Sequence, residues 1–325
     1  LNQVSLEHVE SIEVSKNQAL GSGSTPIGGT IRINTLKEFR DGYRLSSNVG
    51  SFGYREANVS AYQGINGHQL SLGLSHLQSD NNYKFQVHPF ETPTISTRQP
   101  LRNSKFSKTS IFVTDEFHVS SHNIRVNAQF GEQEKQLPNY DNNTPDNHTE
   151  LNATTKRIGV EHSWRSHLDW LPQVSSEIYA SHKREDYLER PSLAVNNEYR
   201  YHNQHLSASV KPNLMIDDVL INPYIEVAIY KFDSESVAIR NATGNCNGQT
   251  LCDLIAEQRN INLGSRLEWL PKSESYSSYF LFNRLLENNS NQAKQGEDTN
   301  EYKETAQYNT AELGFNYELD KWLLS

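Results

Sequence analysis

The residues that come nearest to a chemical site lie in the stretch GSTPIGGT, Gly23 to Thr30, which approaches a phosphate-binding loop. Such a loop reads G-x-x-x-x-G-K-[ST], and Gly29 stands here in place of the lysine that reaches the phosphates. The following IRINT alternates like a strand, whereas a phosphate loop is followed by a helix. The dinucleotide pattern G-x-G-x-x-G fails too, because Pro26 stands at its last position. These observations argue against a nucleotide site, and we interpret the glycines as sharp turns between closely packed strands.

Cys246 and Cys252 are the only cysteines, and they lie in the stretch NCNGQTLC. A pair this close in sequence can close a small loop in an oxidising compartment, and the alternative is two unpaired thiols. The spacing excludes a C-x₂-C zinc knuckle. We favour a disulfide in an exposed loop.

Other candidate metal ligands are weaker. His202 and His205 stand three apart, and on a strand such residues point to opposite faces, so they do not chelate one ion. The oxygens of NYDNNTPDN could bind calcium, although they lack the regular spacing of a calcium loop. A single methionine argues against a thioether copper site. No Ser/His/Asp or paired-carboxylate pattern stands out, so we expect no catalytic residue, no cofactor and no resident metal.

Composition narrows the class of protein. The chain has 325 residues, a net charge of −9, and 16 Tyr and 12 Phe against one Met, which favours strands over helices. An acidic chain without basic clusters argues against nucleic acid as a partner. No apolar run of about eighteen residues is present, so we expect no transmembrane helix. The chain starts at Leu1, and we expect it to be processed or a fragment.

The apolar residues follow a two-residue period along most of the chain. Nearly every second position is apolar in 70–74, 124–130, 225–229, 261–269 and 313–319, and the positions between them are polar. This alternation predicts about twelve strands, each of about ten to sixteen residues, and the start of another at WLLS. Each strand then has one apolar and one polar face.

The lengths of the connections distinguish a sandwich from a membrane barrel. Short connections are expected at 66–68, 120–123, 166–173, 215–218, 271–275 and 319–321, and long ones at 81–106, 136–154, 186–198, 237–257 and 289–303. The two kinds alternate, as they do in a barrel with short turns at one end and long loops at the other. Trp164, Trp170, Trp269 and Trp322 all fall beside short turns, as an interfacial girdle would place them. We therefore predict an all-β fold, a transmembrane antiparallel β-barrel.

The opening segment, Val9 to Thr35, resembles the end of the plug domain of TonB-dependent outer-membrane receptors. The matching residues are Ile12-Glu13-Val14, Gly21, Gly23, Ile27-Gly28-Gly29, Ile31, Ile33, Asn34 and Thr35, while Lys16-Asn17-Gln18 stands where the family has Arg-Gly-Pro. The next stretch, with its GSFG tip at Gly50 to Gly53, resembles the family's first barrel hairpin. The resemblance implies that 1–36 is the C-terminal part of a plug and that 37–325 is the N-terminal part of a 22-strand barrel.

Membership of this family would imply a location in the bacterial outer membrane and active uptake of a scarce nutrient. The implied ligand is a ferric siderophore, cobalamin or another metal complex, and the implied partners are outer-membrane lipid and the inner-membrane TonB complex. For ligand contacts we select residues of the long loops and the adjoining lumen face: Tyr83, His88, Phe90, Tyr140, Asp141, Asp146, His148 and Tyr187. Any of these could instead be a solvated loop residue. The alternative functions are a passive porin or structural barrel, and a docking surface for phage or colicin on the same loops.

Overall fold

The structure is a computed structural model, and it describes residues 9–15, 30–35, 41–87, 97–140, 143–237, 253–270, 276–295, 302–319 and 322–324. The described chain is almost entirely strand, as the two-residue period predicts. Nowhere in it does a helix reach the length and apolar character that a membrane-crossing helix requires.

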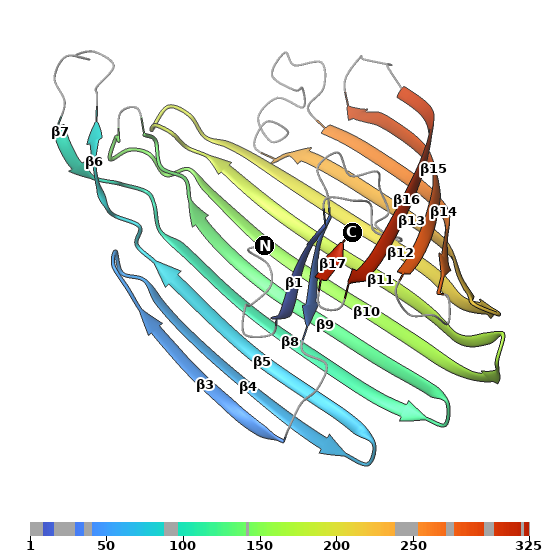
Figure 1. The fold of residues 1–325 in the computed structure, drawn as a ribbon. Helices are drawn as coiled ribbons and strands as arrows, with labels where there is room; N and C mark the ends of the chain where they lie inside the picture. Colours follow the sequence, from blue (N-terminus) through green and yellow to red (C-terminus); the bar gives the residue numbers. More distant parts are fainter. Residues whose placement is uncertain are drawn as a thin grey trace.

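Thirteen strands form one large antiparallel sheet (Figure 1). Its members, in spatial order, are β3 (Gly42–Val49), β4 (Arg55–Ile65), β5 (His68–Ser79), β8 (Phe106–Val119), β9 (His122–Gln136), β10 (Glu150–Leu168), β11 (Leu171–Glu189), β12 (Asn197–Ile216), β13 (Val219–Ser236), β14 (Asp253–Trp269), β15 (Tyr276–Gln295), β16 (Tyr302–Leu319) and β17 (Trp322–Leu324). Two small sheets accompany it: β1 (Val9–Ser15) with β2 (Thr30–Thr35), and β6 (Lys84–Val87) with β7 (Thr97–Pro100).

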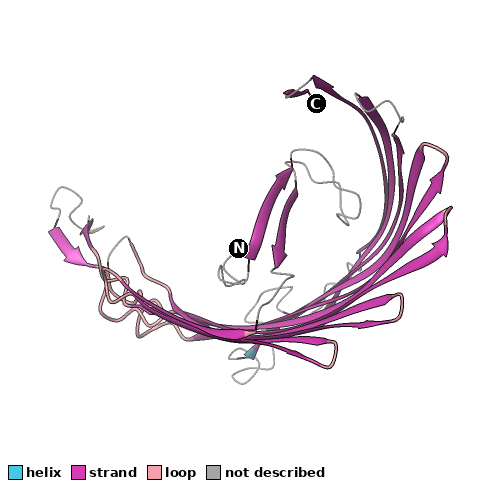
Figure 2. Cartoon of the chain, turned by 60° about the horizontal axis from the view of Figure 1, so that its bottom comes forward, coloured by secondary structure: helices cyan, strands magenta, loops and turns pink. Residues whose placement is uncertain are grey.

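The sheet confirms the predicted strand number, with twelve long strands and a three-residue start of another, β17. The predicted lengths were wrong, since the long strands run from 8 residues in β3 to 20 in β12 and β15. The longer strands continue into stretches whose polar composition had suggested loops. Within the described residues, β3 and β17 stand at opposite ends of the strand order, so the sheet curves without closing (Figure 2).

The alternation of short and long connections is confirmed. Short turns join β4 to β5, β8 to β9, β10 to β11 and β12 to β13, and longer connections join β5 to β8, β9 to β10 and β11 to β12 at the other end of the strands. In the first of these turns, Asn66 and Gly67 both have positive φ, of 51° and 84°, as a tight hairpin turn requires. The small hairpin of β6 and β7 lies inside the predicted loop 81–106 and was not foreseen.

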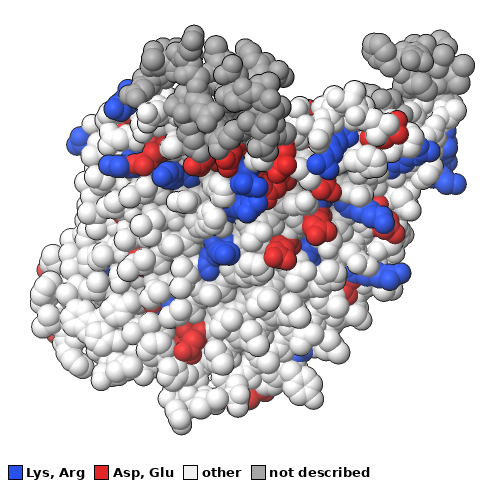
Figure 3. All heavy atoms as spheres, turned by 180° about the vertical axis from the view of Figure 1, so that it is seen from behind, with Lys and Arg blue, Asp and Glu red and all other residues white. Residues whose placement is uncertain are grey.

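The two faces of the sheet differ as the period predicts. On the convex face the central apolar side chains stay exposed, with Leu72 and Ile158 each at 50% and Val227 at 46%. On the concave face Ser71 and Asn262 are each only 1% exposed. Figure 3 shows the convex face with few charged side chains over a broad area, and with Lys, Arg, Asp and Glu gathered toward the long-loop end. An apolar band therefore covers the outside of the curve.

Two glycines of the concave face lie beneath aromatic rings. Gly73 stands directly opposite Phe112, and Gly314 directly opposite Tyr279. A Cβ at either glycine would overlap the ring of its partner. The missing side chain thus makes room for the ring of the neighbouring strand, a packing that reinforces strand pairs at glycines.

The hairpin of β1 and β2 lies on the concave side of the large sheet (Figure 2). Its two strands pair in antiparallel register, with Ile12 opposite Ile33. Both strands belong to 1–36, the segment that resembles the end of a plug domain. The large sheet thus surrounds a second, separately paired element on the side where its own polar residues converge.

Candidate functional site

The concave face is organised by cross-strand register. Because the strands pair without bulges over their central parts, residues far apart in sequence line up in rows across the sheet. Two such groups form recesses at different heights along the strands. The lower one lies nearer the short turns, and the upper one lies nearer the long loops.

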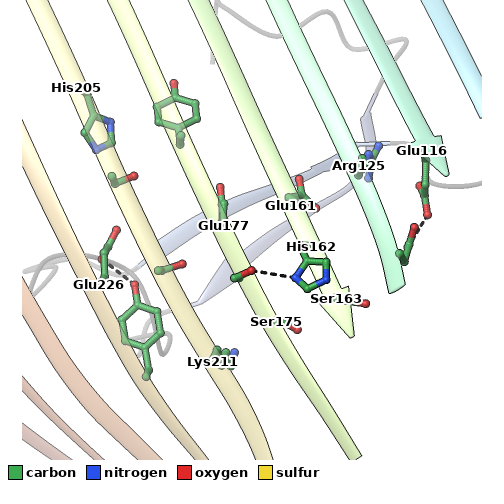
Figure 4. A pocket seen from close by; sticks show the side chains of 16 residues that line it. Glu116, Arg125, Glu161, His162, Ser163, Ser175, Glu177, His205, Lys211 and Glu226 are labelled. Atoms are coloured by element: carbon green, nitrogen blue, oxygen red, sulfur yellow. Dashed lines mark hydrogen bonds between the residues drawn. The ribbon is translucent and has the colours of Figure 1, made fainter. Parts of the chain in front are cut away.

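The lower recess carries four carboxylates, Glu116, Glu161, Glu177 and Glu226, which we call the carboxylate row. The row follows directly from the register: Glu161 is opposite Glu177, and Ser209 lies between Glu177 and Glu226. These side chains line a recess of about 600 Å³, seen from close by in Figure 4. Like charges directly opposite each other on a sheet are unfavourable. The row therefore favours a cationic neighbour.

Arg125 supplies one cation within this row. It is opposite both Glu116 and Glu161, and it is 7% exposed. At the other end of the recess the phenol of Tyr224 donates a 2.7 Å hydrogen bond to Glu226, drawn as a dashed line in Figure 4. No group of three His, Cys, Asp or Glu is placed to hold a metal ion anywhere in the described chain. Lys211 also lines the recess, so four carboxylates face two cations, and the row can attract a basic surface and repel an anion.

The upper recess, nearer the long loops, is aromatic. Tyr201 stacks on Phe232 with ring centres 6.0 Å apart, and His205 stacks on Tyr230 at 4.2 Å. We call these four residues the aromatic wall. Of the four, His205, Tyr230 and Phe232 line a recess of about 630 Å³ that also reaches Tyr302. Flat rings and amides of this kind suit a bulky, partly planar ligand.

Tyr83 and Tyr140 meet in the loops that follow β5 and β9. Phe85 lies between them, with its ring centre 6.3 Å from Tyr83 and 5.9 Å from Tyr140, and Phe52 lies 6.0 Å from Tyr83. A hydrogen bond with Tyr83, together with burial, raises the pKa of the Tyr140 phenol above its ordinary value. The two loops that carry these tyrosines therefore pack as one unit.

Buried asparagines hold that unit together. Asn143, 2% exposed, accepts from the backbone N–H of Arg102 at 2.9 Å and donates to the carbonyl of Pro100 at 3.0 Å. Asn103 donates to the carbonyls of Leu137 and Thr149. These side chains satisfy loop backbone groups that no strand partner reaches. Asn147 of the same stretch also donates to the carbonyl of Leu137, at 2.9 Å.

The structure brings together some of the predicted ligand residues and separates others. Tyr83 and Tyr140 share the loop cluster, while Tyr187 stacks on Tyr199 at 6.0 Å on the inner wall. His148 bonds through its backbone N–H to the Arg190 carbonyl, and the backbone N–H of Asp146 donates to Thr144. His88, Phe90 and Asp141, and also Cys246 and Cys252, lie outside the described residues.

The interpretation of YHNQH is confirmed. His202 stacks on His182, with ring centres 5.4 Å apart, while His205 stacks on Tyr230. Alternation along β12 places the two histidines on opposite faces. The aromatic wall and the carboxylate row were missed by the sequence analysis, because only the register shows which residues are neighbours. The signal was present as polar or aromatic residues at every second position.

Comparisons with known proteins agree with this geometry. No family model matches the chain, and no curated protein matches it in sequence. Among solved structures, the copper transporter OprC matches 95% of the chain with a TM-score of 0.70 and 13% identity, over 47% of its own length. The siderophore receptor PiuA from Acinetobacter baumannii matches 96% with a TM-score of 0.68 and 8% identity, over 52% of its length.

The FrpB iron transporter from Neisseria meningitidis matches 97% of the chain with a TM-score of 0.68 and 9% identity, over 50% of its length. The chain thus spans about half the length of each of these structures. All three are TonB-dependent outer-membrane receptors. The chain therefore has the fold of the corresponding half of a TonB-dependent outer-membrane receptor.

Proposed function

We propose that the chain belongs to a receptor of the bacterial outer membrane that takes up a metal complex actively, with energy delivered by TonB. One observation carries the proposal: a sheet with an apolar convex face curves around a separate hairpin on its polar concave side. A sheet that is apolar outside suits a wall facing lipid. A paired element inside the curve suits a gated path better than an open pore. The similar solved structures, which are named as copper, siderophore and iron transporters or receptors, support the same function.

In this proposal the hairpin of β1 and β2 is the end of a plug domain comprising 1–36, and 37–325 is barrel wall. The carboxylate row then faces the plug, because it lies on the concave side that the hairpin occupies. TonB, pulling on the plug, would open a path past this row. The protein has no catalytic role, and its work is selective binding followed by transport.

The ligand is held at the long-loop end. The aromatic wall and Tyr187 line the inside of the sheet, and Tyr83 and Tyr140 contact Phe85 in the loops that follow β5 and β9. His88, Phe90, Asp141, Asp146 and His148 belong to the same loops and remain ligand candidates. A ferric siderophore is the ligand class we favour, and cobalamin is the alternative.

The test is energy-dependent uptake. The protein is expressed from its own gene in a strain that lacks other receptors, and uptake of radioactive ferric chelates and of cyanocobalamin is followed with and without TonB. We expect saturable uptake of a ferric chelate that disappears without TonB. Uptake that is unsaturable and unchanged without TonB would identify a passive porin and contradict the proposal.

A deletion sharpens this test. Removing 9–35 should convert the protein into a pore that admits small solutes without TonB, because the concave side would then be open. A variant lacking the β6–β7 hairpin, 84–100, is the control, since that hairpin lies outside the sheet. If the first deletion leaves the membrane as impermeable as the control does, the hairpin is not part of a plug.

A further inference from the structure

Two histidines form a hydrogen-bonded pair on the convex face, near the short turns. Nδ1 of His122 lies 2.9 Å from Nε2 of His162, and Nδ1 of His162 lies 3.2 Å from the hydroxyl oxygen of Ser176. We call these three residues the imidazole relay. His122 begins β9, directly after the short turn from β8, and the relay continues across β10 to β11. Hydrogen-bonded side chains thus link three neighbouring strands.

Alternation along the strands assigns the relay to the convex face. His162 shares its face with Ile158, which stands four residues earlier on β10 and is 50% exposed. Ser176 is directly opposite His162, and His122 is directly opposite Trp164, the next residue on that face of β10. His162 and Ser176 also border the lower recess of the concave face (Figure 4), because a sheet is a single backbone layer that a residue can border on both sides.

The relay stands at the edge of the apolar band. At a rise of about 3.4 Å per residue, His162 lies about 13 Å along β10 from Ile158, in the direction of the short turn. The apolar band of a membrane barrel is about 25 Å tall, so this distance leads from its middle to its border with the lipid headgroups. Trp164, whose ring centre is 6.3 Å from that of His122, stands at the same border, as an interfacial tryptophan does.

One ring nitrogen of the relay is left over. A neutral imidazole donates a hydrogen bond through one nitrogen and accepts through the other. Both nitrogens of His162 are occupied within the relay, and so is Nδ1 of His122. Nε2 of His122 has no hydrogen-bond partner among the residues that the structure describes. This nitrogen is therefore available to a group outside the chain.

The order of the protons decides what Nε2 of His122 can bind. When Ser176 donates to His162 and His162 donates to His122, the hydrogen atom of His122 is on Nε2, which is then a donor. In the reverse order Nε2 is an acceptor. An anionic oxygen in front of Nε2 favours the first order, and each hydrogen bond of the relay then strengthens the next.

A phospholipid supplies an anionic oxygen at this height. Its phosphate is attached directly to the glycerol and lies at the border of the hydrocarbon, while the remaining headgroup atoms lie farther out. Asp115, two strands away on the same face, lies 2.9 Å from His68, so this carboxylate has a partner of its own. Toward the turn, Arg165 and Asp169 add one charge of each sign. An anion can therefore approach the relay without facing an excess of negative charge.

We propose that the imidazole relay binds the phosphate of a phospholipid in the leaflet on the short-turn side of the membrane, with Nε2 of His122 as the donor. The two histidines have different roles: His122 contacts the phosphate, and His162 positions the ring of His122 through Nδ1. The inference concerns the contact with lipid and does not depend on which solute is transported.

Two substitutions separate the outward nitrogen from the bond within the relay. The amide of an asparagine reaches the place of Nδ1, so His122→Asn keeps a partner for His162 and loses the outward donor. The amide of a glutamine reaches the place of Nε2, so His122→Gln keeps an outward donor. His182→Asn is the control, since His182 forms a similar pair with His202, at 3.2 Å, near the long loops.

The experiment uses the whole receptor in maltoside detergent, which contains no phosphate. The receptor is titrated with phosphatidylglycerol that carries a photoreactive diazirine in its headgroup. A galactosyl lipid with the same acyl chains and the same diazirine is the second probe. After illumination, mass spectrometry measures how much of the tryptic peptide 158–165, which contains His162 and Trp164, is labelled at each probe concentration.

We expect phosphatidylglycerol to label this peptide at an about tenfold lower concentration than the galactosyl lipid, since it adds a hydrogen bond to a charged oxygen. His122→Asn should remove the difference between the probes, whereas His122→Gln and His182→Asn should retain it. Equal labelling by both probes in the unaltered receptor would overturn the proposal. Equal losses in the Asn and Gln variants would do so too, because the ring itself, and not its outward N–H, would then hold the lipid.

Discussion

The convex and concave faces of the large sheet are made by the same strands, yet they follow opposite rules of burial. Leu72 is 50% exposed on the convex face, while its neighbour in sequence, Ser71, is 1% exposed on the concave face. In a water-soluble sandwich the apolar residue would be the buried one. The apolar face is therefore adapted to an apolar solvent, and the polar face provides the packed interior.

The largest effect expected from this comparison is on the convex face. Val227 lies between Ala208 and Ile261 in the apolar band and is 46% exposed. Val227→Lys should lower the stability of the barrel in lipid by roughly 2–4 kcal/mol, the cost of a lysine near the middle of a bilayer. Reversible unfolding of the receptor in liposomes measures this change.

The matched substitution on the concave face should act in the other direction. Ser209→Lys places the same side chain between Glu177 and Glu226, where a cation is favourable. We expect unchanged or slightly higher stability. If both lysines destabilise the protein equally, the assignment of the two faces is wrong.

A smaller effect tests packing on the concave face. Gly73→Ala should destabilise the sheet by about 1–3 kcal/mol, because the added methyl group overlaps the ring of Phe112. Gly131→Ala is the control, since a Cβ there would have its nearest neighbours at an ordinary 3.7 Å. In a Phe112→Ala background, Gly73→Ala should cause almost no further loss of stability, because the ring that the methyl group overlaps is absent. A full cost in that background would show that the strain has another origin.

The smallest effect on the overall stability of the barrel is expected for substitutions in the loops beyond the ends of the strands. Asn143→Ala removes the bonds to the backbone of Arg102 and Pro100 and should loosen this loop while hardly changing the unfolding of the barrel. Faster tryptic cleavage after Arg98 or Arg102 in folded receptor would report it. The control variant Asp146→Ala, which is changed at an exposed turn, should be cleaved at the same rate as the unaltered receptor. Unchanged cleavage of the Asn143 variant would mean that other contacts hold the loop.

Much of the fold follows from local pattern. The two-residue period predicts the strands and their faces, and turn residues such as Asn66-Gly67 predict where hairpins reverse. The predicted strands were too short because polar residues continue each strand beyond the apolar band, as in the upper part of β12. Polarity alone does not separate a loop from a strand that leaves the membrane.

The candidate site was less predictable, because its neighbours are set by register. Glu161 and Glu177 meet because the turn between β10 and β11 brings 161 opposite 177, and a slip of one residue would turn one of them to the convex face. Tyr83 and Tyr140 could be proposed from residue type and loop position. The contacts of Phe85 with these tyrosines, and the hydrogen bonds of Asn143 between the loops, depend on how the loops fold. No periodic pattern in the sequence predicts such contacts.

The connectivity of the large sheet has a consequence for how it assembles. Apart from the step from β5 to β8, neighbouring strands of the large sheet are also consecutive in the chain. Each added hairpin therefore closes only a short loop, so the entropy lost at each step is small and the sheet can grow in one direction. The same connectivity makes the hairpin a modular unit. A pair of strands inserted or lost at a long loop would change the circumference of the wall while leaving the register of the remaining rows intact.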